Sequence, residues 1–283
     1  MTTSSSQSSG GTDWASDFFG TLNAMPREPV EGIGQVLESM ATLPAFEEVR
    51  LWLLRHLGLS EGSSVIEAGC GTGAALSDIL SIVGPNGRVV GIDPTNAFID
   101  QARRRASSFD APNTSYELGD VRKIAHADAS FDACFCDKIL IHVGPTNAAL
   151  SEMTRVTRPG GRVGAIEWLP YFLASASNVS GLDAFNDIFR KAVHDYFISA
   201  NLTRHFHEVG LRHVRAQAVL AHTNDLDSHP FWRAFIFAQM PMFTHVGLID
   251  EATGNAFLAD IEELNRKGEF SASFIVQAAV GTK

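Results

Sequence analysis

The sequence is poor in cysteine and in basic charge, and each shortage excludes a class of protein. Three cysteines in 283 residues cannot build a disulfide framework, and no His or Cys cluster with metal-ligand spacing accompanies them. Free thiols of this kind are typical of a reducing compartment, so we expect a cytoplasmic protein without a metal site. Lysine and arginine number 22 against 32 acids, a net charge of −10, which argues against nucleic acid as a partner.

Long apolar runs are also missing, and no stretch approaches the roughly 20 residues of a membrane-spanning helix. The first 13 residues carry neither basic residues nor an apolar run, unlike a secretory signal. Their Ser and Gly content predicts a disordered tail. We therefore expect the chain to have three parts: a tail at 1–13, helices over 14–60 and a main domain over 61–283.

The main domain alternates apolar strands with amphipathic helices, as in an α/β protein with a doubly wound parallel sheet. Strands are predicted at 64–67, 88–92, 114–118, 132–137, 162–168, 213–222 and 272–282. The helices between them are predicted at 74–83, 96–106, 147–156 and 201–210. Two aromatic-rich segments, at about 169–198 and 229–267, are expected to be helical insertions.

The most informative motif is the decapeptide at 64–73, Ser-Val-Ile-Glu-Ala-Gly-Cys-Gly-Thr-Gly. A short apolar strand ends in Glu67, and Gly69, Gly71 and Gly73 follow at alternate positions before a helix. Such a turn lets a nucleotide-like ligand lie against the backbone, because a Cβ would block its approach. No lysine follows the glycines, so the turn is not a phosphate-binding P-loop.

Acids also follow the next two strands, at the sheet edge where ligands bind in such folds. Asp93 after the second strand is placed to accept hydrogen bonds from ribose hydroxyls. Asp120 after the third strand could accept one from an exocyclic amine. The fourth strand is followed by 137–142, which adds an acid, a lysine and a histidine.

Four motifs occur together in the order and spacing of class I S-adenosylmethionine-dependent methyltransferases, and the chain resembles that family over about 46–168 and its last two strands. The motifs are Val65-Ile-Glu-Ala-Gly-Cys-Gly-Thr-Gly73, Gly91-Ile-Asp-Pro94, Gly119-Asp-Val121 and Arg158-Pro-Gly-Gly161. Within the family the chain looks like the ubiquinone/menaquinone-biosynthesis type and its small-molecule relatives. The run Asp137-Lys-Ile-Leu-Ile-His142 suits that group, which often has Arg where Lys138 stands.

The resemblance implies a Rossmann-like sheet of seven strands with the last antiparallel, and S-adenosylmethionine as cofactor. Gly69 and Gly71 would lie against its methionine part, with Glu67 near the amino group. Asp93 would take the ribose hydroxyls. The rest of the implied cofactor site comprises Asp120 at adenine N6, the Val121 N–H at adenine N1, and Phe98, Cys70, Pro94 and Asp137 around the ligand.

Two residues are candidates for a general base, which is needed only if the methyl acceptor must lose a proton. His142 leads because it follows the fourth strand, and Glu167 at the end of the fifth strand is second. For both, orienting a loop or the substrate is the alternative role. The aromatic insertions predict a lid over an apolar or aromatic small-molecule pocket, and the N-terminal helices could close over it or pack on a second subunit.

The expected function is methyl transfer to carbon, oxygen or nitrogen of a hydrophobic or aromatic small molecule, in quinone-type or secondary-metabolite biosynthesis. Two alternatives remain at this point. One is a non-catalytic S-adenosylmethionine-binding protein. The other is an NAD(P)-dependent oxidoreductase, although the glycines here read G-x-G-x-G rather than the G-x-G-x-x-G typical of that class.

Overall fold

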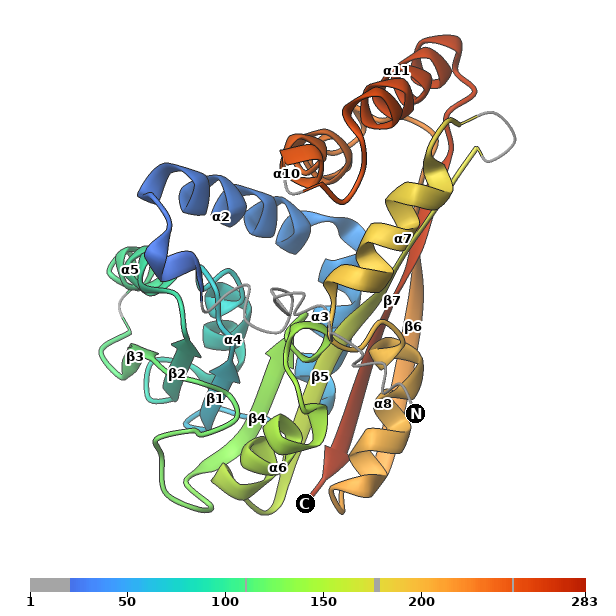
Figure 1. Cartoon of the computed structure of the whole chain (residues 1–283). Coiled ribbons are helices and arrows are strands. Elements are labelled where there is room, and N and C mark those ends of the chain that lie inside the picture. Colours follow the sequence, from blue (N-terminus) through green and yellow to red (C-terminus); the bar gives the residue numbers. More distant parts are fainter. Residues whose placement is uncertain (1–20, 110, 176–178, 246) are drawn as a thin grey trace, which may run out of the picture.

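A seven-stranded sheet forms the centre of the computed structural model, which describes residues 21–109, 111–175, 179–245 and 247–283 (Figure 1). The strand order is β3-β2-β1-β4-β5-β7-β6. The first five pair in parallel, and β7 is antiparallel to both of its neighbours, which confirms the predicted Rossmann-like α/β fold. In that order, the strands are Thr114–Leu118, Arg88–Asp93, Ser64–Ala68, Phe131–Asp137, Thr157–Ala174, Ala272–Thr282 and Arg212–Thr223.

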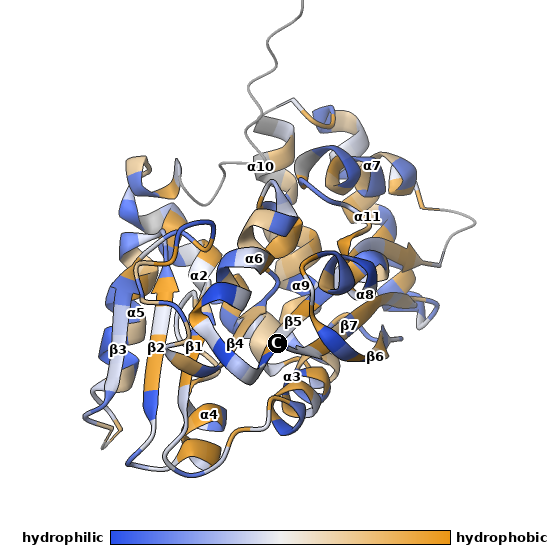
Figure 2. Cartoon of the chain, turned by 90° about the horizontal axis from the view of Figure 1, so that it is seen from below, coloured by the Kyte–Doolittle hydropathy of each residue, from blue (hydrophilic) through white to orange (hydrophobic). Residues whose placement is uncertain are grey.

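Helices cover both faces of this sheet, so its central strands are mainly apolar, as the orange colour of β2 shows in Figure 2. On β7, Phe274 contacts Phe46 of α3, whereas a Cβ on Gly281 would touch Phe206 of α8. Because side chains alternate along a strand, these two helices lie on opposite faces. The helices beside the sheet are α3 (Pro44–His56), α4 (Leu76–Val83), α5 (Asn96–Ala106), α6 (Thr146–Val156) and α8 (Ile198–Glu208).

The fifth strand is longer than predicted, and the expectation of helix from residue 169 onward is wrong over 169–174. Leu169 and Leu173 continue the antiparallel ladder with β7, on either side of an irregularity in register. The apolar run at 169–173 has no clear period, so only its partner strand decides its conformation. The helix of this insertion is α7 (Leu182–Ala192).

The second insertion is helical, as predicted. It contains α9 (Pro230–Arg233), η4 (Ala234–Ala238), α10 (Met240–His245) and α11 (Glu251–Lys267). η4 has π-helical hydrogen bonding, a rare geometry that is frequent at functional sites. Figure 1 shows α10 and α11 beyond the carboxyl ends of the strands, on the same side as α2.

The N-terminal part is helical where it is described. η1 (Leu22–Ala24) and α2 (Arg27–Thr42) precede α3, and α2 crosses above the carboxyl ends of the parallel strands (Figure 1). The predicted tail at 1–13 lies outside the described residues, as do Trp14, Phe18 and Phe19. The oligomer contact through these helices therefore stays a prediction. None of the described helices combines the length and hydropathy needed to cross a bilayer.

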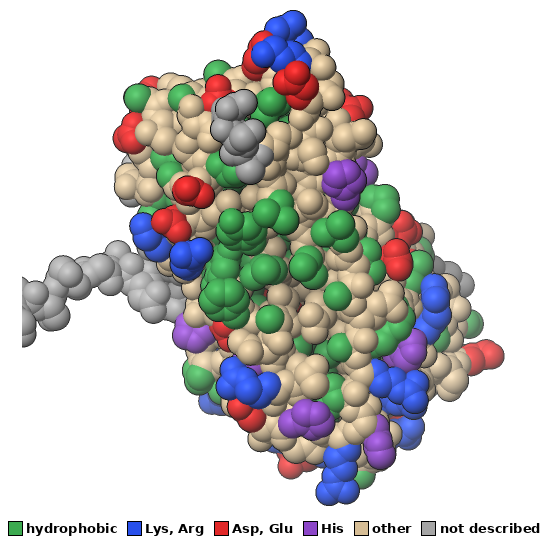
Figure 3. Space-filling model, turned by 90° about the vertical axis from the view of Figure 1, so that its right-hand side faces the viewer, with side chains coloured by type: hydrophobic (Ala, Val, Ile, Leu, Met, Phe, Trp, Pro, Cys, Tyr) green, Lys and Arg blue, Asp and Glu red, His purple; other side chains and the backbone are tan. Residues whose placement is uncertain are grey.

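Apolar side chains also gather on the face shown in Figure 3, on the side of the molecule where β6 and β7 lie in Figure 1. Leu220 of β6 pairs with Ile275 of β7, and their exposed fractions are 59% and 43%. This exposed strip lies on the sheet face that α8 covers farther along the strands.

Candidate active site

A cavity of about 870 Å³ opens at the carboxyl edge of the parallel strands and is lined in part by residues of α2. Its volume lies in the upper part of the range of roughly 300–1,000 Å³ for small-molecule sites. The loops after β1, β2, β3 and β4 line one half, and α2, α7, η4 and α10 contribute to the other. The strand order reverses between β1 and β4, which is the switch point where ligands of such sheets bind.

The glycine turn after β1 adopts conformations that favour glycine. Its two cavity-lining glycines are needed for different reasons. Gly69 has φ +75°, and a Cβ there would overlap the Ile139 side chain. Gly71 has φ +51°, and among the described atoms only Leu37 Cδ1, at 3.9 Å, lies within 4 Å of its Cβ position. The close approach at Gly69 is therefore an internal packing requirement, whereas Gly71 leaves room for a ligand.

Glu67 is a buried carboxyl group on the cavity wall, with only 4% of its surface exposed. No described residue hydrogen-bonds to it. Burial raises its pKa to about 8, the carboxylate of Asp137 adds to the shift, and Arg50 and Lys138 oppose it. Glu67 is therefore mostly protonated at neutral pH, and a cation placed beside it would favour its charged form.

Asp93 ties the glycine turn to the end of β2. Its Oδ2 accepts from the Gly71 N–H at 3.0 Å, and its Oδ1 accepts from the Thr95 N–H at 2.8 Å. The Thr95 side chain also hydrogen-bonds to this carboxylate, so three of its roughly four lone-pair positions are used inside the protein. Burial raises the pKa of Asp93, although both backbone hydrogen bonds oppose this. Pro94 and Phe98 line the same wall.

Asp120 lies on the wall beside Val121, but its carboxylate is already paired inside the protein. The Arg122 guanidinium lies 2.7 Å from Oδ2 through Nη2 and 3.0 Å from Oδ1 through Nε. Hydrogen bonding from Arg122 lowers the pKa of Asp120, so this group is charged. The ion pair was not predictable from the motif and restricts which Asp120 lone pairs face a ligand.

The end of β4 brings a second ion pair into the cavity. Lys138 Nζ lies 2.6 Å from Asp137 Oδ1 and 4.7 Å from the centroid of the Phe46 ring. The Lys138 N–H donates to the Ile166 carbonyl at 2.8 Å. The ammonium group therefore lies between an acid of the strand ends and the Phe46 ring. Cys70 and Asp137 both line the cavity, and their contact with the cofactor stays a prediction.

His142 lines the cavity from the short turn η2 (Leu140–His142). Burial lowers its pKa to about 4, so the imidazole is neutral at physiological pH. A neutral imidazole can accept a proton, although one with so low a pKa is a weak base. This suits an acceptor that is itself readily deprotonated.

Glu167 does not line the cavity, so the structure separates it from the other predicted site residues. It is fully buried, its Oε1 accepts from the Leu140 N–H at 2.7 Å, and its Oε2 has no hydrogen-bond partner among the described atoms. Burial raises its pKa to about 8. This placement favours the orienting role over the catalytic one, because Glu167 holds the turn that carries His142.

The helix α2 covers the cavity and is fastened to the residues around the cofactor loops. The Glu38 carboxylate accepts hydrogen bonds from the Thr72 hydroxyl and the Arg105 guanidinium. In the preceding segment, Asn23 donates to the Pro94 carbonyl at 2.7 Å and accepts from the Asn96 N–H at 2.8 Å. Sequence reasoning missed these contacts because they join positions more than 30 residues apart.

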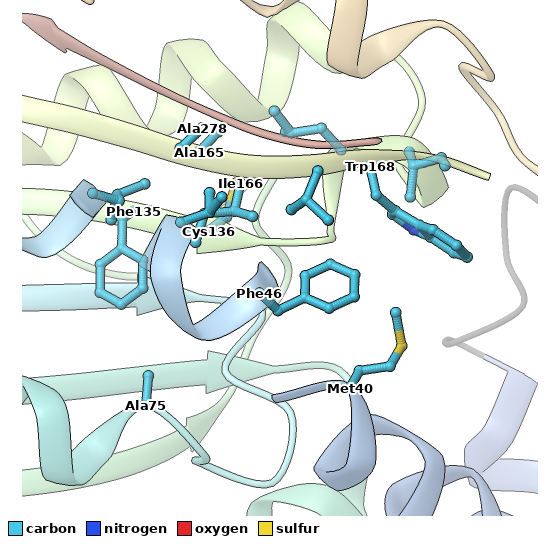
Figure 4. Close-up of a cluster of buried hydrophobic side chains, with 14 of the residues drawn as sticks. Met40, Phe46, Ala75, Phe135, Cys136, Ala165, Ile166, Trp168 and Ala278 are labelled. Atoms are coloured by element: carbon cyan, nitrogen blue, oxygen red, sulfur yellow. The ribbon is translucent and has the colours of Figure 1, made fainter. Parts of the chain in front are cut away.

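The other half of the cavity is apolar and aromatic. Figure 4 shows Met40 of α2, Phe46 of α3 and Trp168 of β5 converging on one another. The Trp168 and Phe235 rings meet edge to face at 5.3 Å, and Phe189 stacks on Phe235 at 5.3 Å. The lining residues of this half include Met40, Trp168, Phe189, Val193, Phe235 and Phe243.

Most other aromatic residues of the insertions pack within the protein core. Phe172, Phe185 and Phe231 are buried and do not line the cavity, and Tyr171 is 37% exposed. Only part of the aromatic pattern therefore points to a binding surface. Within the described residues, no cluster of His, Cys, Asp and Glu could hold a metal ion.

Comparison with known proteins relates the chain to a family described as "Methyltransferase domain", whose profile matches residues 59–170. An uncharacterised 37.1 kDa protein in transposon TN4556 of Streptomyces fradiae is 37% identical over 134 residues, which cover 47% of this chain and 38% of that protein. The chain thus spans less than half of that relative. Demethylmenaquinone methyltransferase of Beutenbergia cavernae is 31% identical over 184 residues, 58% of this chain and 73% of the relative.

The fold is shared with solved structures at low sequence identity. The crystal structure of the 4+2 cyclase SpnF superposes with a TM-score of 0.61 and 14% identity, over 93% of this chain and 96% of the cyclase. At this identity the likeness shows the fold alone, and the chemistry must be argued from the site.

Proposed function

We propose that this chain, which belongs to the class I S-adenosylmethionine-dependent methyltransferases, transfers a methyl group to a hydrophobic or aromatic small molecule. The observation that carries the proposal is the division of one cavity into two unlike halves. Acids and backbone of the strand ends line one half, and aromatic and aliphatic side chains line the other. A quinone-type or secondary-metabolite acceptor and a cytoplasmic location are part of the same proposal.

The polar half fits S-adenosylmethionine. The Glu67 carboxyl group, which no described residue hydrogen-bonds, would meet the amino group of the cofactor, and the open space at Gly71 would admit its methionine part. The remaining lone pair of Asp93 would accept from a ribose hydroxyl. Asp120 and the Val121 N–H would bind the adenine edge.

When bound, S-adenosylmethionine supplies a methyl group on a positively charged sulfur atom, which is already activated for transfer. The chain's own task is to hold the acceptor in line and to exclude water. The helix α2 and the aromatic wall exclude water from the apolar half. His142 would accept a proton at its ring nitrogen where the acceptor releases one, and Glu167 would keep the η2 turn in place.

Two measurements test the proposal. Titration calorimetry of the folded protein with S-adenosylhomocysteine should show binding, and chromatography should show S-adenosylhomocysteine formation from S-adenosylmethionine with an aromatic acceptor panel. Absence of binding by a folded sample would refute the proposal. Binding without turnover across quinols, phenols and indoles would favour the non-catalytic alternative.

A further inference from the structure

We infer that the methyl acceptor carries no phosphate, diphosphate or carboxylate group, and that its polar part is neutral. This inference rests on the proposed function and concerns the acceptor half of the same cavity. It follows from where the charged side chains of the cavity lie and from what each of them already contacts.

The cations of the cavity wall are held by acids of the protein. Arg50 Nε lies 2.8 Å from Asp78 Oδ2, and Lys138 Nζ lies 2.6 Å from Asp137 Oδ1. The third cation, Arg122, is the one already paired with Asp120. Among the lining residues that the structure describes there are no other lysines or arginines. An anionic acceptor would have to take one of these cations from its partner and leave a half-buried carboxylate without a counter-charge.

The sign of the wall charge also disfavours an anion. The three cations are outnumbered by four acids, Glu67, Asp93, Asp120 and Asp137. With Glu67 protonated this balance is about zero, and with Glu67 charged beside the ligand's ammonium group it is negative, so it is not positive in either state. Cavities that bind phosphates need the opposite arrangement, with arginine, lysine or backbone N–H groups in excess.

Beyond Lys138, which is paired with Asp137 at its border, the apolar half offers hydrogen bonds but no charge among the described lining residues. Apart from the neutral imidazole of His142, its polar side chains include Gln239 at the end of η4 and Ser39 of α2. An amide and a hydroxyl group can pair with a hydroxyl or carbonyl group of a ligand. They cannot replace the water shell of a phosphate, so transfer of a phosphate from water into this half is unfavourable.

The inference is tested with matched probes that share one ring system. 1-Naphthol, 1-naphthyl phosphate and 1-naphthoic acid are titrated into the protein saturated with S-adenosylhomocysteine, and their fluorescence is followed. We expect 1-naphthol to bind at least tenfold more tightly than either anion. Equal or tighter binding of an anion would overturn the inference. Failure of the neutral probe to bind would overturn it as well, because the apolar half should accept naphthol.

A pair of variants isolates the role of charge. Gln239→Lys adds a cation to the apolar half, and Gln239→Met is its uncharged control of similar length. We expect naphthyl phosphate to gain at least tenfold in affinity in the lysine variant relative to the methionine variant. No gain would overturn the inference, because charge would then not be what keeps the anion out. Titration of S-adenosylhomocysteine alone reports on the proposed function separately.

Discussion

Binding of S-adenosylhomocysteine should release a proton from Glu67. The ligand brings an ammonium group beside the Glu67 carboxyl group. This carboxyl group is buried, and no described residue hydrogen-bonds to it. Burial raises the pKa of Glu67 to about 8, whereas the group has a usual value of 4.5. A neighbouring cation favours the carboxylate and moves the pKa back toward that value.

The size of the effect follows from the pKa. At pH 7 a group with a pKa of about 8 holds about 0.9 of a proton, and a return to about 4.5 removes nearly all of it. Between about pH 4.5 and 8 ligand binding must displace this proton, so the affinity rises with pH by about tenfold per unit. Above pH 8 the group is already charged and this dependence ends.

The assay is titration calorimetry with S-adenosylhomocysteine at pH 7 in buffers of different ionisation enthalpy. The slope of the observed enthalpy against the buffer's ionisation enthalpy gives the number of protons released. Dissociation constants between pH 6 and 7.5 give an independent value, below the range of about 7.7–8.0 in which an ordinary α-amino group begins to lose its own proton.

The control is Glu67→Gln, which keeps the shape of the side chain and cannot ionise. It should bind more weakly at pH 7.5, release no proton from this position and show a flat affinity between pH 6 and 7.5. Equal proton release by the wild type and this variant would refute the reasoning, because the proton would then come from another group.

Four further substitutions test the other parts of the site. Asp93→Ala should weaken S-adenosylhomocysteine binding by about 1–3 kcal/mol, since it removes partners of charged hydrogen bonds. Calorimetry measures the loss, thermal unfolding checks the glycine turn, and unchanged affinity would contradict the ribose assignment. His142→Ala should lower turnover and leave S-adenosylhomocysteine affinity unchanged, and full activity would exclude an obligatory base. Glu167→Ala should lower kcat. Glu167→Gln should keep it, because the amide oxygen can still accept from the Leu140 N–H. An equal loss of kcat in both variants would argue against the role of Glu167 in positioning the η2 turn. Glu38→Gln should speed S-adenosylhomocysteine release in stopped-flow measurements, because it weakens the contacts that hold α2 over the cavity. An unchanged rate would show that the ligand leaves without movement of α2.

The acids and glycines of the cofactor half could be predicted because they follow strand ends, whereas Val121 and Phe98 were implied by the resemblance to the family. An acid or a glycine at the end of a parallel strand must lie at the same edge of the sheet as its neighbours. Ten residues were predicted to contact the cofactor, and all ten line the cavity. They are Glu67, Gly69, Cys70, Gly71, Asp93, Pro94, Phe98, Asp120, Val121 and Asp137. Their contacts with the cofactor remain predictions.

Glu167 shows where strand-end reasoning becomes insufficient. Adjacent residues of a strand point to opposite faces, so Trp168 and Glu167 cannot both face the cavity. Trp168 lines it, and Glu167 turns toward the backbone of η2. The alternation was visible in the sequence, but which of the two residues faces the cavity depends on how α3 and the insertions pack.

The cover of the cavity was not predictable in detail, because it depends on contacts between distant segments. Glu38 reaches Thr72 and Arg105 across more than 30 positions. Periodicity reports the apolar face of a helix such as α2, and it does not reveal which surface that face will meet. The same reason explains the extra length of β5, whose last residues are strand only because β7 runs beside them.

The two halves of the cavity come from different kinds of segment, and this has a consequence for how such enzymes diverge. The polar half is built from short loops of the sheet, whereas α7, η4 and α10 belong to insertions outside the strand–helix alternation. Substitutions in the insertions can therefore alter the accepted molecule while leaving the methyl donor's site intact. We expect that replacing 179–192 and 230–245 with the corresponding segments of a related chain would change which acceptor is bound. Trp168 and Met40, which line the cavity outside these segments, would stay the same.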